Sequence, residues 1–491
     1  MTLSKSLYTR AIQCQKALWL KKYKKEVLTP PNESSLAVFE VGNEVGGLAC
    51  ELFKGGKEVP YSKNYDEMIA TTKEYLDAKV EYIYEATFRF DGILVMVDVL
   101  HVKGDEVSIY EVKSSTSLKE IYLHDCSIQH YVLQNLGFNV KSTHVVHIDS
   151  SYVRGEELEL DKLFSVVDVS QEVCTLVQRI PFVLSELEGS LKEHEPNIEI
   201  GKQCNKPYEC DAKEYCWKTQ RGIPEYSMFN IFNLGSKKQI ELYKQGIVDI
   251  ADIPETFEMT QKQAEAVANY KSQKTYIDKK AIKEFCDTLS YPIYYLDFET
   301  YQQAIPLYKG IKPFEQIPFQ YSLHVEHSEG SLEHYEFLAE AGKDSKRALA
   351  QRLVKDIPLH VNTLAYNMSF EKGVIKRLAE QFEDLHVELM SIHDNMKDLM
   401  VPFQKKHFVS PSMKGSYSIK YVLPALVPQM QEAYKKLDGV QNGGDAMRVF
   451  ASLHVKSLEE QNNIREQLKK YCKLDTLAMV KVLEKLKEII E

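Results

Sequence analysis

Two carboxylates and a lysine lie close together in the first part of this chain. Asp98 lies within ILVMVDVLHV, and Glu111 and Lys113 lie within VSIYEVKSS. Residues two apart in a strand project from the same face, so Glu111 and Lys113 share a face. Carboxylates placed in this way hold Mg²⁺ or Mn²⁺, and a lysine orients water or stabilises charge on a phosphate. The same residues are also compatible with a surface hairpin that carries an ordinary Glu–Lys pair.

A second acidic group begins in the apolar stretch YPIYYLDFE. Asp297 and Glu299 are two apart, which places both on one strand face and suits a shared pair of metal ions. Near the C-terminus, Tyr471 and Asp475 are four apart and therefore lie on one helix face. Between these blocks, AYNMSFEKGVI contains two further polar candidates, Asn367 and Glu371. Either of two nearby acidic residues, Asp394 and Asp398, could serve as a spare ligand, although an exposed helix face is favoured for both.

Four of the nine cysteines form a third candidate set. Cys204, Cys210 and Cys216 are evenly spaced, and Cys14 lies far upstream in AIQCQKALWL. Four thiolates suit either a [4Fe–4S] cluster or a structural zinc ion. Zinc sites favour paired C-x2–4-C ligands, which this chain lacks, so the wide spacing favours the cluster. Ligation would join the two ends of the segment, and we assign the other cysteines to packing: Cys50, Cys126, Cys174, Cys286 and Cys472.

Hydrophobic periodicity predicts the elements that must position the first group. Helical patterning covers residues 6–23, and a second helical stretch covers residues 39–53. Alternation then predicts strands over YEATFRF, ILVMVDVLHV and VSIYEVKSS, with a hairpin turn at Lys103–Glu106. The helical stretch LHDCSIQHYVLQNLG and the strand THVVHID follow. This order predicts a mixed α/β domain over residues 1–220.

Two further regions follow the first domain. Residues 221–285 are predicted to be a helical connector, because LGSKKQIELYKQGIVDIADIPE has the rhythm of a helix, a glycine turn and a short second helix. Such a unit is compatible with a DNA-backbone contact, although a plain spacer is favoured. Residues 286–491 are predicted to be a second α/β domain, with strands over YPIYYLDFE, FQYSLHVE and LEHYEFL and helices thereafter.

Composition sets outer bounds on these interpretations. A length of 491 residues predicts more than one domain, and 44% apolar with 27% charged residues is typical of a globular chain. The sequence has no apolar run of the roughly 18 residues that a membrane span needs, and MTLSKSLYTR lacks a signal-peptide core, so we expect a cytoplasmic protein without a membrane partner. A net charge of −10 does not by itself predict nucleic-acid binding, although a local basic track is compatible with it.

The first domain resembles the RecB-like branch of the PD-(D/E)xK nucleases, including the CRISPR adaptation nucleases with an iron–sulfur cluster. Those proteins carry one cysteine before a basic-aromatic helix, as in Cys14-Gln-Lys-Ala-Leu-Trp-Leu, and three cysteines after the catalytic core. The resemblance implies that Asp98 and Glu111 are metal ligands, that Lys113 is catalytic and that Gln129 supports it from the next helix.

This chain departs from that family at two positions. The family's usual histidine ligand, four residues after a helix glycine, corresponds to Gly46 when counted from Gly42. Glu44 is the candidate substitute, one turn away. A tyrosine expected four residues after Gln129 is replaced by Leu133, with Tyr131 nearby. The domain is therefore either a divergent active nuclease or one that has lost activity.

The last domain resembles the DEDD exonucleases of the RNase H-like, DnaQ-type fold, in the subclass with Tyr-x3-Asp. The resemblance implies two metal ions held by four carboxylates, Asp297, Glu299, Glu371 and Asp475. It further implies that Tyr471 orients the attacking water and that Asn367 contacts substrate. Glu371 is a departure, because the family prefers aspartate there.

Together the two resemblances point to a bacterial family that fuses an iron–sulfur RecB-like nuclease to a DnaQ-like module. They imply a metal-dependent nuclease with two active sites that acts on DNA ends or single strands, in repair or in the handling of phage and mobile elements. Two alternatives stay open at this point. One is an RNA-processing 3′–5′ exonuclease, and the other is a nucleic-acid-binding scaffold in which one or both sites have decayed.

Overall fold

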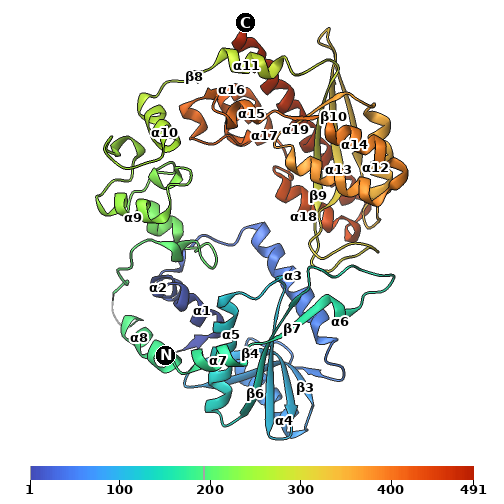
Figure 1. The fold of residues 1–491 in the computed structure, drawn as a ribbon. Helices are drawn as coiled ribbons and strands as arrows, with labels where there is room; N and C mark the ends of the chain where they lie inside the picture. Colours follow the sequence, from blue (N-terminus) through green and yellow to red (C-terminus); the bar gives the residue numbers. More distant parts are fainter. Residues whose placement is uncertain (1, 192–193) are drawn as a thin grey trace. The chain divides into compact units, whose positions relative to one another are not determined.

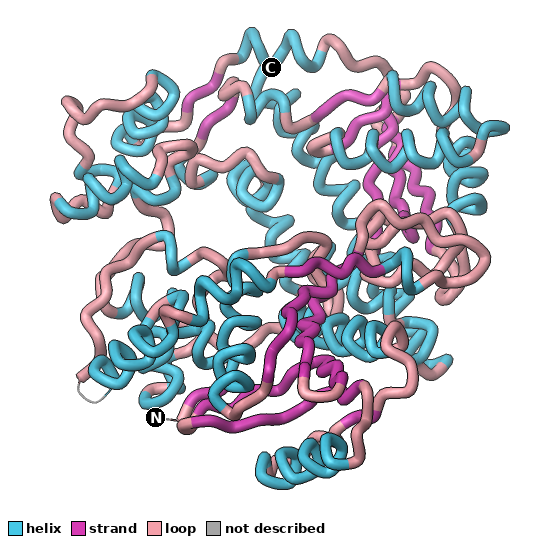
Figure 2. The backbone as a smooth tube through the Cα atoms, turned by 60° about the horizontal axis from the view of Figure 1, so that its bottom comes forward, coloured by secondary structure: helices cyan, strands magenta, loops and turns pink. Residues whose placement is uncertain are grey.

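The computed structural model describes residues 2–191 and 194–491 (Figures 1 and 2). The chain divides into two compact units. The first comprises Met1–Gly222 and Gln303–Glu315, and the second comprises Ile223–Gln302 and Gln316–Glu491. Each unit contains helices packed on a sheet with parallel and antiparallel strands, so the predicted mixed α/β class is confirmed. Every helix within the described ranges is too short or too polar to cross a bilayer.

The first unit is built on a seven-stranded sheet with the order β2-β3-β4-β5-β6-β7, and β1 pairs in parallel with β4. Strand β5 pairs antiparallel with β4 and parallel with β6, which is possible because helix α5 (Glu120–Asn135) crosses between β5 and β6. The strands are β1 (Leu3–Ser4), β2 (Lys57–Glu58), β3 (Tyr82–Phe90), β4 (Ile93–Lys103), β5 (Glu106–Lys113), β6 (Asn139–Ile148) and β7 (Phe164–Asp168).

The β4–β5 hairpin sets the register of the first acidic group. Lys103 pairs with Glu106 across a two-residue turn in which Gly104 has a φ of +63°, a conformation that glycine adopts without strain. Val99 pairs with Tyr110, so Asp98 and Glu111 occupy opposed positions on neighbouring strands. The core beneath is aliphatic and includes Val97, Ile109, Ile128 and Val132 from the hairpin and α5.

The helical patterning over residues 6–23 corresponds to two helices, which the structure separates at Cys14. Helix α1 (Lys5–Gln13) ends there and α2 (Gln15–Tyr23) begins there, and Cys14 itself has an extended backbone. The periodicity could not reveal this break, since α1 and α2 each carry an apolar face. The other helices of this unit are α3 (Glu33–Cys50), α4 (Tyr65–Asp77), α6 (Leu160–Leu163), α7 (Ser170–Val177) and α8 (Ile180–Leu191).

The second unit is built on a five-stranded sheet with the order β11-β10-β9-β12-β13. Strands β9 and β10 are antiparallel, whereas β9, β12 and β13 run parallel. The strands are β9 (Ile293–Tyr301), β10 (Ile317–Glu326), β11 (Leu332–Leu338), β12 (Asn362–Ala365) and β13 (Met396–Asp398), with a separate pair formed by β8 (Tyr276–Ile277) and β14 (Phe408–Val409).

Helices cover both faces of this sheet (Figure 1). Helices α12 (Lys346–Asp356), α13 (Ser369–Gln381) and α14 (His386–Asp394) enclose one core, in which Leu296 and Phe298 of β9 are buried. The long helix α19 (Leu458–Ile490) encloses the other core, which contains Ile293 and Tyr295. The remaining helices are α9 (Ser236–Lys244), α10 (Gln261–Ser272), α11 (Lys279–Cys286), α15 (Val401–Gln404), α16 (Ile419–Leu426), α17 (Pro428–Lys435) and α18 (Gly443–Ala451).

Candidate functional site

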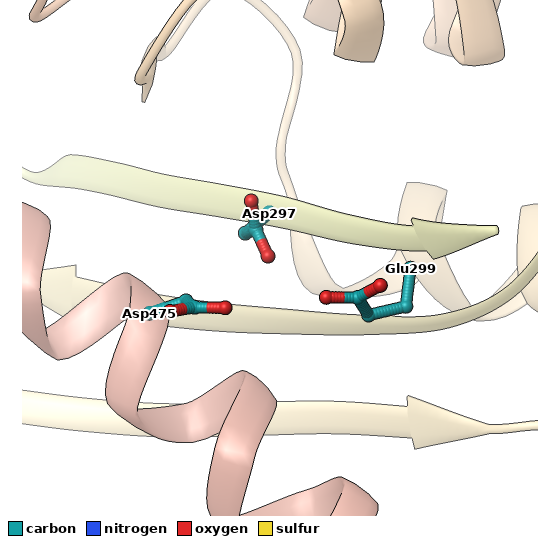
Figure 3. A group of neighbouring side chains, drawn as sticks. All are labelled: Asp297, Glu299 and Asp475. Atoms are coloured by element: carbon teal, nitrogen blue, oxygen red, sulfur yellow. The ribbon is translucent and has the colours of Figure 1, made fainter. Parts of the chain in front are cut away.

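Three carboxylates meet in the second unit, between strand β9 and helix α19 (Figure 3). Even-numbered residues of β9 face the core of α12–α14, so the odd-numbered Asp297 and Glu299 face α19. Asp475 projects from α19 toward them. One oxygen from each of Asp297, Glu299 and Asp475 lies within 4.8 Å of the others. The structure therefore brings together residues that are almost 180 positions apart in the sequence.

We call this carboxylate group, with Glu371 beside it, the second centre, and other carboxylates and burial dominate its electrostatics. Burial, together with Asp475 and Glu299, raises the pKa of Asp297 well above its usual range. Burial, Asp475 and Glu371 raise the pKa of Glu299 to about 8. For Asp475, burial outweighs hydrogen bonds from tyrosines and a weak attraction from Lys420, so its pKa is also raised. Like charges gathered in a poorly solvated place destabilise each other's ionised forms, and a cation would relieve that repulsion.

Glu371 adds a fourth carboxyl group to this centre without joining the closest three. It lies in the first turn of α13, is 3% exposed, and its Oε2 atom has no hydrogen-bond partner among the described residues. Burial raises its pKa to about 8. Its charge acts on both Asp297 and Glu299. An unpartnered carboxylate oxygen in a buried position is expensive to leave unsatisfied, so this atom indicates a place for a bound cation.

Two tyrosines hold Asp475 from different helices. The Tyr434 hydroxyl, on α17, donates a hydrogen bond of 2.6 Å to Oδ1 of Asp475. Tyr471, one turn before Asp475 on α19, is buried and also hydrogen-bonds to it. Nearby carboxylates and burial raise the pKa of both phenols, so both stay protonated donors. Tyr434 was not a candidate from the sequence, because no spacing relates it to the acidic blocks.

Asn367 and Asp398 belong to one turn beside the second centre. Asn367 is exposed after β12 with a φ of +67°, a left-handed conformation that asparagine tolerates better than most residues. Asp398 accepts hydrogen bonds from the backbone N–H groups of Asn367, Met368 and Met400. The expectation that Asp398 lies on an exposed helix face is wrong: it is buried at the end of β13, where it fixes this turn. Asp394 is exposed beside His393, as expected.

The first acidic centre, in the other unit, is compensated by lysines from within the protein. The Glu111 side chain is 1% exposed, and both of its oxygens lie 2.9 Å from Nζ of Lys5. Lys113 donates to Oε1 at 2.7 Å and Gln129 donates to Oε2 at 2.7 Å. Lys113 also forms a 2.7 Å ion pair with Asp125. Each oxygen of Glu111 thus already has two donors.

The carboxyl groups of this centre have pKa values shifted in opposite directions. Burial tends to raise the pKa of Glu111, but Lys113 and Lys5 outweigh it and lower this pKa below its usual value. Asp98 has the opposite shift, because burial and the Glu111 charge raise its pKa despite Lys5, 3.7 Å away. Its Oδ2 accepts the backbone N–H of Val112 at 2.7 Å. Glu85, whose pKa is raised to about 7 by burial and by Asp98, is a further carboxyl group here.

Lys5 and Glu85 are functional candidates that the sequence did not reveal. Lys5 is separated from Glu111 by 106 positions, and its ammonium group lies between Asp98 and Glu111, where the resemblance places a metal ion. Glu85 has a left-handed backbone, with a φ of +56°, opposite Asp98 on β3. The proposed substitute ligand Glu44 is exposed on α3. As they stand, the residues of this centre fit a metal ion less well than those of the second centre.

All four candidate cysteines line one cavity in the first unit. Cys14 comes from the α1–α2 break, Cys204 from a short 3-10 turn, and Cys216 from the turn at Tyr215–Thr219. Polar contacts join the same segments: Arg10 forms a bidentate ion pair with Asp211 at 2.7 and 2.8 Å. Lys16 also lies 2.9 Å from Glu195. The distant ends of the first domain are therefore neighbours.

The spacing of these sulfur atoms bears on the kind of cofactor they could bind. With Zn–S bonds of about 2.3 Å, four sulfurs around one tetrahedral zinc ion are roughly 3.8 Å apart. Among the described residues, the only group of three or more metal-binding side chains with ligand atoms within 4.8 Å is the carboxylate set. No three of the four cysteine sulfurs therefore lie within 4.8 Å of one another, so they are not gathered at the spacing of a single zinc site.

Comparison with known proteins identifies relatives of part of the chain. A family model described as a domain of unknown function (DUF2779) matches residues 294–418. The uncharacterized protein UU173 of Ureaplasma parvum serovar 3 is 26% identical over 246 residues, which cover 45% of this chain and 35% of that protein. The uncharacterized protein MG366 of Mycoplasma genitalium is 27% identical over 228 residues, with 40% and 32% covered. The chain spans about a third of these curated relatives.

Proposed function

We propose that this protein is a divalent-metal-dependent nuclease and that the second centre hydrolyses phosphodiester bonds. The observation that carries the proposal is the convergence of Asp297, Glu299 and Asp475 within 4.8 Å, where the charges that shift the pKa of Asp297 are all carboxylates. Carboxylate oxygens are the ligands that Mg²⁺ and Mn²⁺ prefer. The partnerless oxygen of Glu371 supports the same conclusion.

In this proposal the carboxylates of the second centre bind the metal, and the tyrosines orient a ligand or the attacking water. Asp297, Glu299, Asp475 and Glu371 would hold the metal, which supplies Lewis-acid stabilisation of charge on the phosphate and a more acidic bound water. Tyr434 fixes the orientation of Asp475 through its 2.6 Å hydrogen bond. Tyr471 remains protonated because its pKa is raised, so its hydroxyl donates a hydrogen bond and does not act as a general base. We assign it the orientation of the attacking water, in keeping with the resemblance to DnaQ-type exonucleases.

We extend the proposal to the first unit as a RecB-like module that handles nucleic acid. The contacts of Glu111 with Lys113 and Gln129, and of Lys5 with both Glu111 and Asp98, support this extension. Cleavage there would require a metal ion to displace the Lys5 ammonium group, so we assign no metal-dependent step to this centre. We further propose that Cys14, Cys204, Cys210 and Cys216 hold a [4Fe–4S] cluster that joins the ends of the unit.

The direct test is cleavage of end-labelled single-stranded and duplex DNA and RNA with Mg²⁺ or Mn²⁺. We expect Asp297→Asn and Asp475→Asn to lower the rate at least about 100-fold, because each removes a charged ligand from the reacting centre. Asp394→Asn is the matched control, since Asp394 is an exposed aspartate of the same unit. Unchanged cleavage by Asp297→Asn would overturn the assignment to the second centre.

The same assay separates DNA from RNA as substrate. DNA is favoured, in line with repair or defence against mobile elements, and faster cleavage of matched RNA would replace this with RNA processing. Binding of nucleic acid without turnover in either metal would instead support a scaffold with decayed sites. Iron content and a visible absorption band of anaerobically purified protein test the cluster separately, and Cys210→Ser should remove both.

A further inference from the structure

An exposed aromatic residue lies on the segment between two of the cavity-lining cysteines. Tyr208 is 50% exposed, whereas Cys204 and Cys210 on either side line the cavity. The segment is closed at its base by a 2.9 Å hydrogen bond from the backbone N–H of Cys210 to the carbonyl of Cys204. Gln13 on α1 donates to the carbonyl of Tyr208 at 2.7 Å. The backbone of Tyr208 is therefore anchored while its ring remains accessible.

The side chains of Tyr208 and Tyr122 contact each other, and Lys119 lies near both rings. The Tyr208 hydroxyl hydrogen-bonds to that of Tyr122, which is buried in the first turn of α5. Nζ of Lys119 lies 5.7 Å from the centre of the Tyr208 ring and 5.8 Å from that of Tyr122. Lys119 is exposed, so its ammonium group remains available to a ligand. An exposed aromatic ring beside an exposed cation is a combination that binds unpaired nucleotides.

These residues are continuous with the first acidic centre. Nζ of Lys113 lies 5.1 Å from the centre of the Tyr122 ring and 2.7 Å from Oε1 of Glu111. A path of direct contacts thus leads from Glu111 through Lys113 and Tyr122 to the exposed ring of Tyr208. A nucleotide on that ring would lie beside the residues to which the RecB-like resemblance assigns chemistry.

We propose that Tyr208 and Lys119 form a docking platform for single-stranded nucleic acid, in which an unpaired base stacks on the Tyr208 ring and Lys119 contacts its phosphate. The inference rests on the proposal that the first unit handles nucleic acid. It assigns recognition of the single-stranded form to two residues, since a base stacked inside a duplex has no free face to offer. It also assigns a second role to the segment between Cys204 and Cys210, because the backbone conformation that places these cysteines at the cavity also places Tyr208 near the first centre.

The test is equilibrium binding of the full-length protein in EDTA, which separates binding from cleavage. Fluorescence anisotropy with a labelled oligothymidylate of about 12 nucleotides, and with a duplex of equal length, reports the two affinities. We expect Tyr208→Ala to weaken single-strand binding about 5- to 150-fold, because stacking of one base is lost, and to change duplex binding less than about twofold. Tyr208→Phe and Tyr208→Trp should remain within about threefold of the unaltered protein, since both keep a ring.

Two further variants sharpen this test. Tyr61→Ala is the matched control, because Tyr61 is a tyrosine of the same unit with 71% exposure, and it should bind like the unaltered protein. Lys119→Ala should reduce the slope of log affinity against log salt by about 0.7, which is the effect of one lost phosphate contact on a single strand.

The platform is overturned if Tyr208→Ala binds the single strand normally, or if Tyr208→Phe loses as much affinity as Tyr208→Ala. It is also overturned if Tyr61→Ala shows an equal loss, since the effect would then not be specific to this segment. These outcomes are independent of the nuclease proposal. If the unaltered protein cleaves no substrate but Tyr208→Ala weakens single-strand binding, the platform proposal stands and the nuclease proposal fails. If the unaltered protein cleaves DNA but Tyr208→Ala binds single strands normally, only the platform proposal fails.

Discussion

The two acidic centres of this protein differ in the charged groups that surround their buried carboxylates. In the first centre, Lys5 and Lys113 lie 2.9 and 2.7 Å from Glu111 and lower its pKa. In the second centre, the neighbours of Asp297 that shift its pKa are other carboxylates, and its pKa is strongly raised. The charge of Glu111 is therefore compensated by lysines of the protein itself, whereas the neighbouring charges that act on Asp297 repel its ionised form.

This difference in charge compensation bears on how readily each centre could accept a metal ion. A carboxylate with two donors on each oxygen has little capacity left for a metal ion, and removing its partners is costly. A group of carboxylates without cations is under repulsion that binding a divalent ion relieves. An acidic motif in a sequence thus indicates a metal site only after the basic residues around it are known.

The largest expected difference between the two centres is in the change of stability when one carboxylate charge is removed. Glu111→Gln should lower the free energy of unfolding by about 3–5 kcal/mol, because it removes the charge of a buried carboxylate that two half-buried lysines share. For a domain of this size, that corresponds to a fall in Tm on the order of 10 °C in EDTA. Asp297→Asn should leave Tm unchanged or raise it, since it removes a repelling charge.

Glu106→Gln is the control for that comparison. Glu106 lies on the same strand as Glu111 but forms only an exposed ion pair with Lys141, so we expect a change within about 0.5 kcal/mol. Equal destabilisation by Glu111→Gln and Asp297→Asn would show that the two centres do not differ in charge compensation.

Divalent metal should stabilise the protein chiefly through the second centre. Mn²⁺ at about 100 times its dissociation constant should add about 2.7 kcal/mol to the free energy of unfolding. Asp297→Asn should remove most of this gain, while Asp98→Asn should retain it, as a thermal shift with and without Mn²⁺ would reveal. A gain that Asp98→Asn removes and Asp297→Asn retains would reverse our ranking of the two sites.

The pH dependence of the metal-free protein should reflect the second centre. Glu299 and Glu371 have pKa values raised to about 8, so the folded state binds protons that the unfolded state has released. Stability contributed by these groups is complete below the unfolded pKa, near 4.5, and is lost as pH rises toward 8. We expect Tm in EDTA to fall by several degrees between pH 5 and pH 8, and Glu299→Gln to flatten this decline.

Glu111 contributes in the opposite direction. Because its pKa is lowered in the folded state, its stabilising effect is present above the unfolded pKa and is lost at more acidic pH. A Glu299→Gln protein whose Tm still falls as steeply between pH 5 and pH 8 would contradict the assignment of that slope to the second centre.

The smallest effect is expected from the tyrosine that supports Asp475. Tyr434→Phe removes one 2.6 Å hydrogen bond and should weaken Mn²⁺ binding about 10-fold, as loss of a residue that orients a metal ligand does. Titration calorimetry measures this change directly. Tyr421→Phe, at a partly exposed tyrosine of the same unit, should bind Mn²⁺ normally. Loss of equal size in both variants would show that Tyr434 has no particular role.

Local elements were the part of this fold most open to prediction. The strand at YPIYYLDFE corresponds to β9 (Ile293–Tyr301), and the helix at LHDCSIQHYVLQNLG to α5 (Glu120–Asn135), because alternation and 3.6-residue periodicity record which side is buried. The break at Cys14 was not predicted, since both halves carry helical patterning. Asp398 was misplaced because its role, accepting three backbone N–H groups, depends on a neighbouring strand.

The sequence by itself determined which residues of each motif share a face, since that follows from the two-residue repeat of a strand and the turn of a helix. It could not determine what those faces meet. Lys5 beside Glu111, Tyr434 beside Asp475 and Tyr208 beside Tyr122 are contacts between distant parts of the chain. Only the packing of helices on the sheets decided them, because charge compensation depends on distance in space and leaves no local pattern.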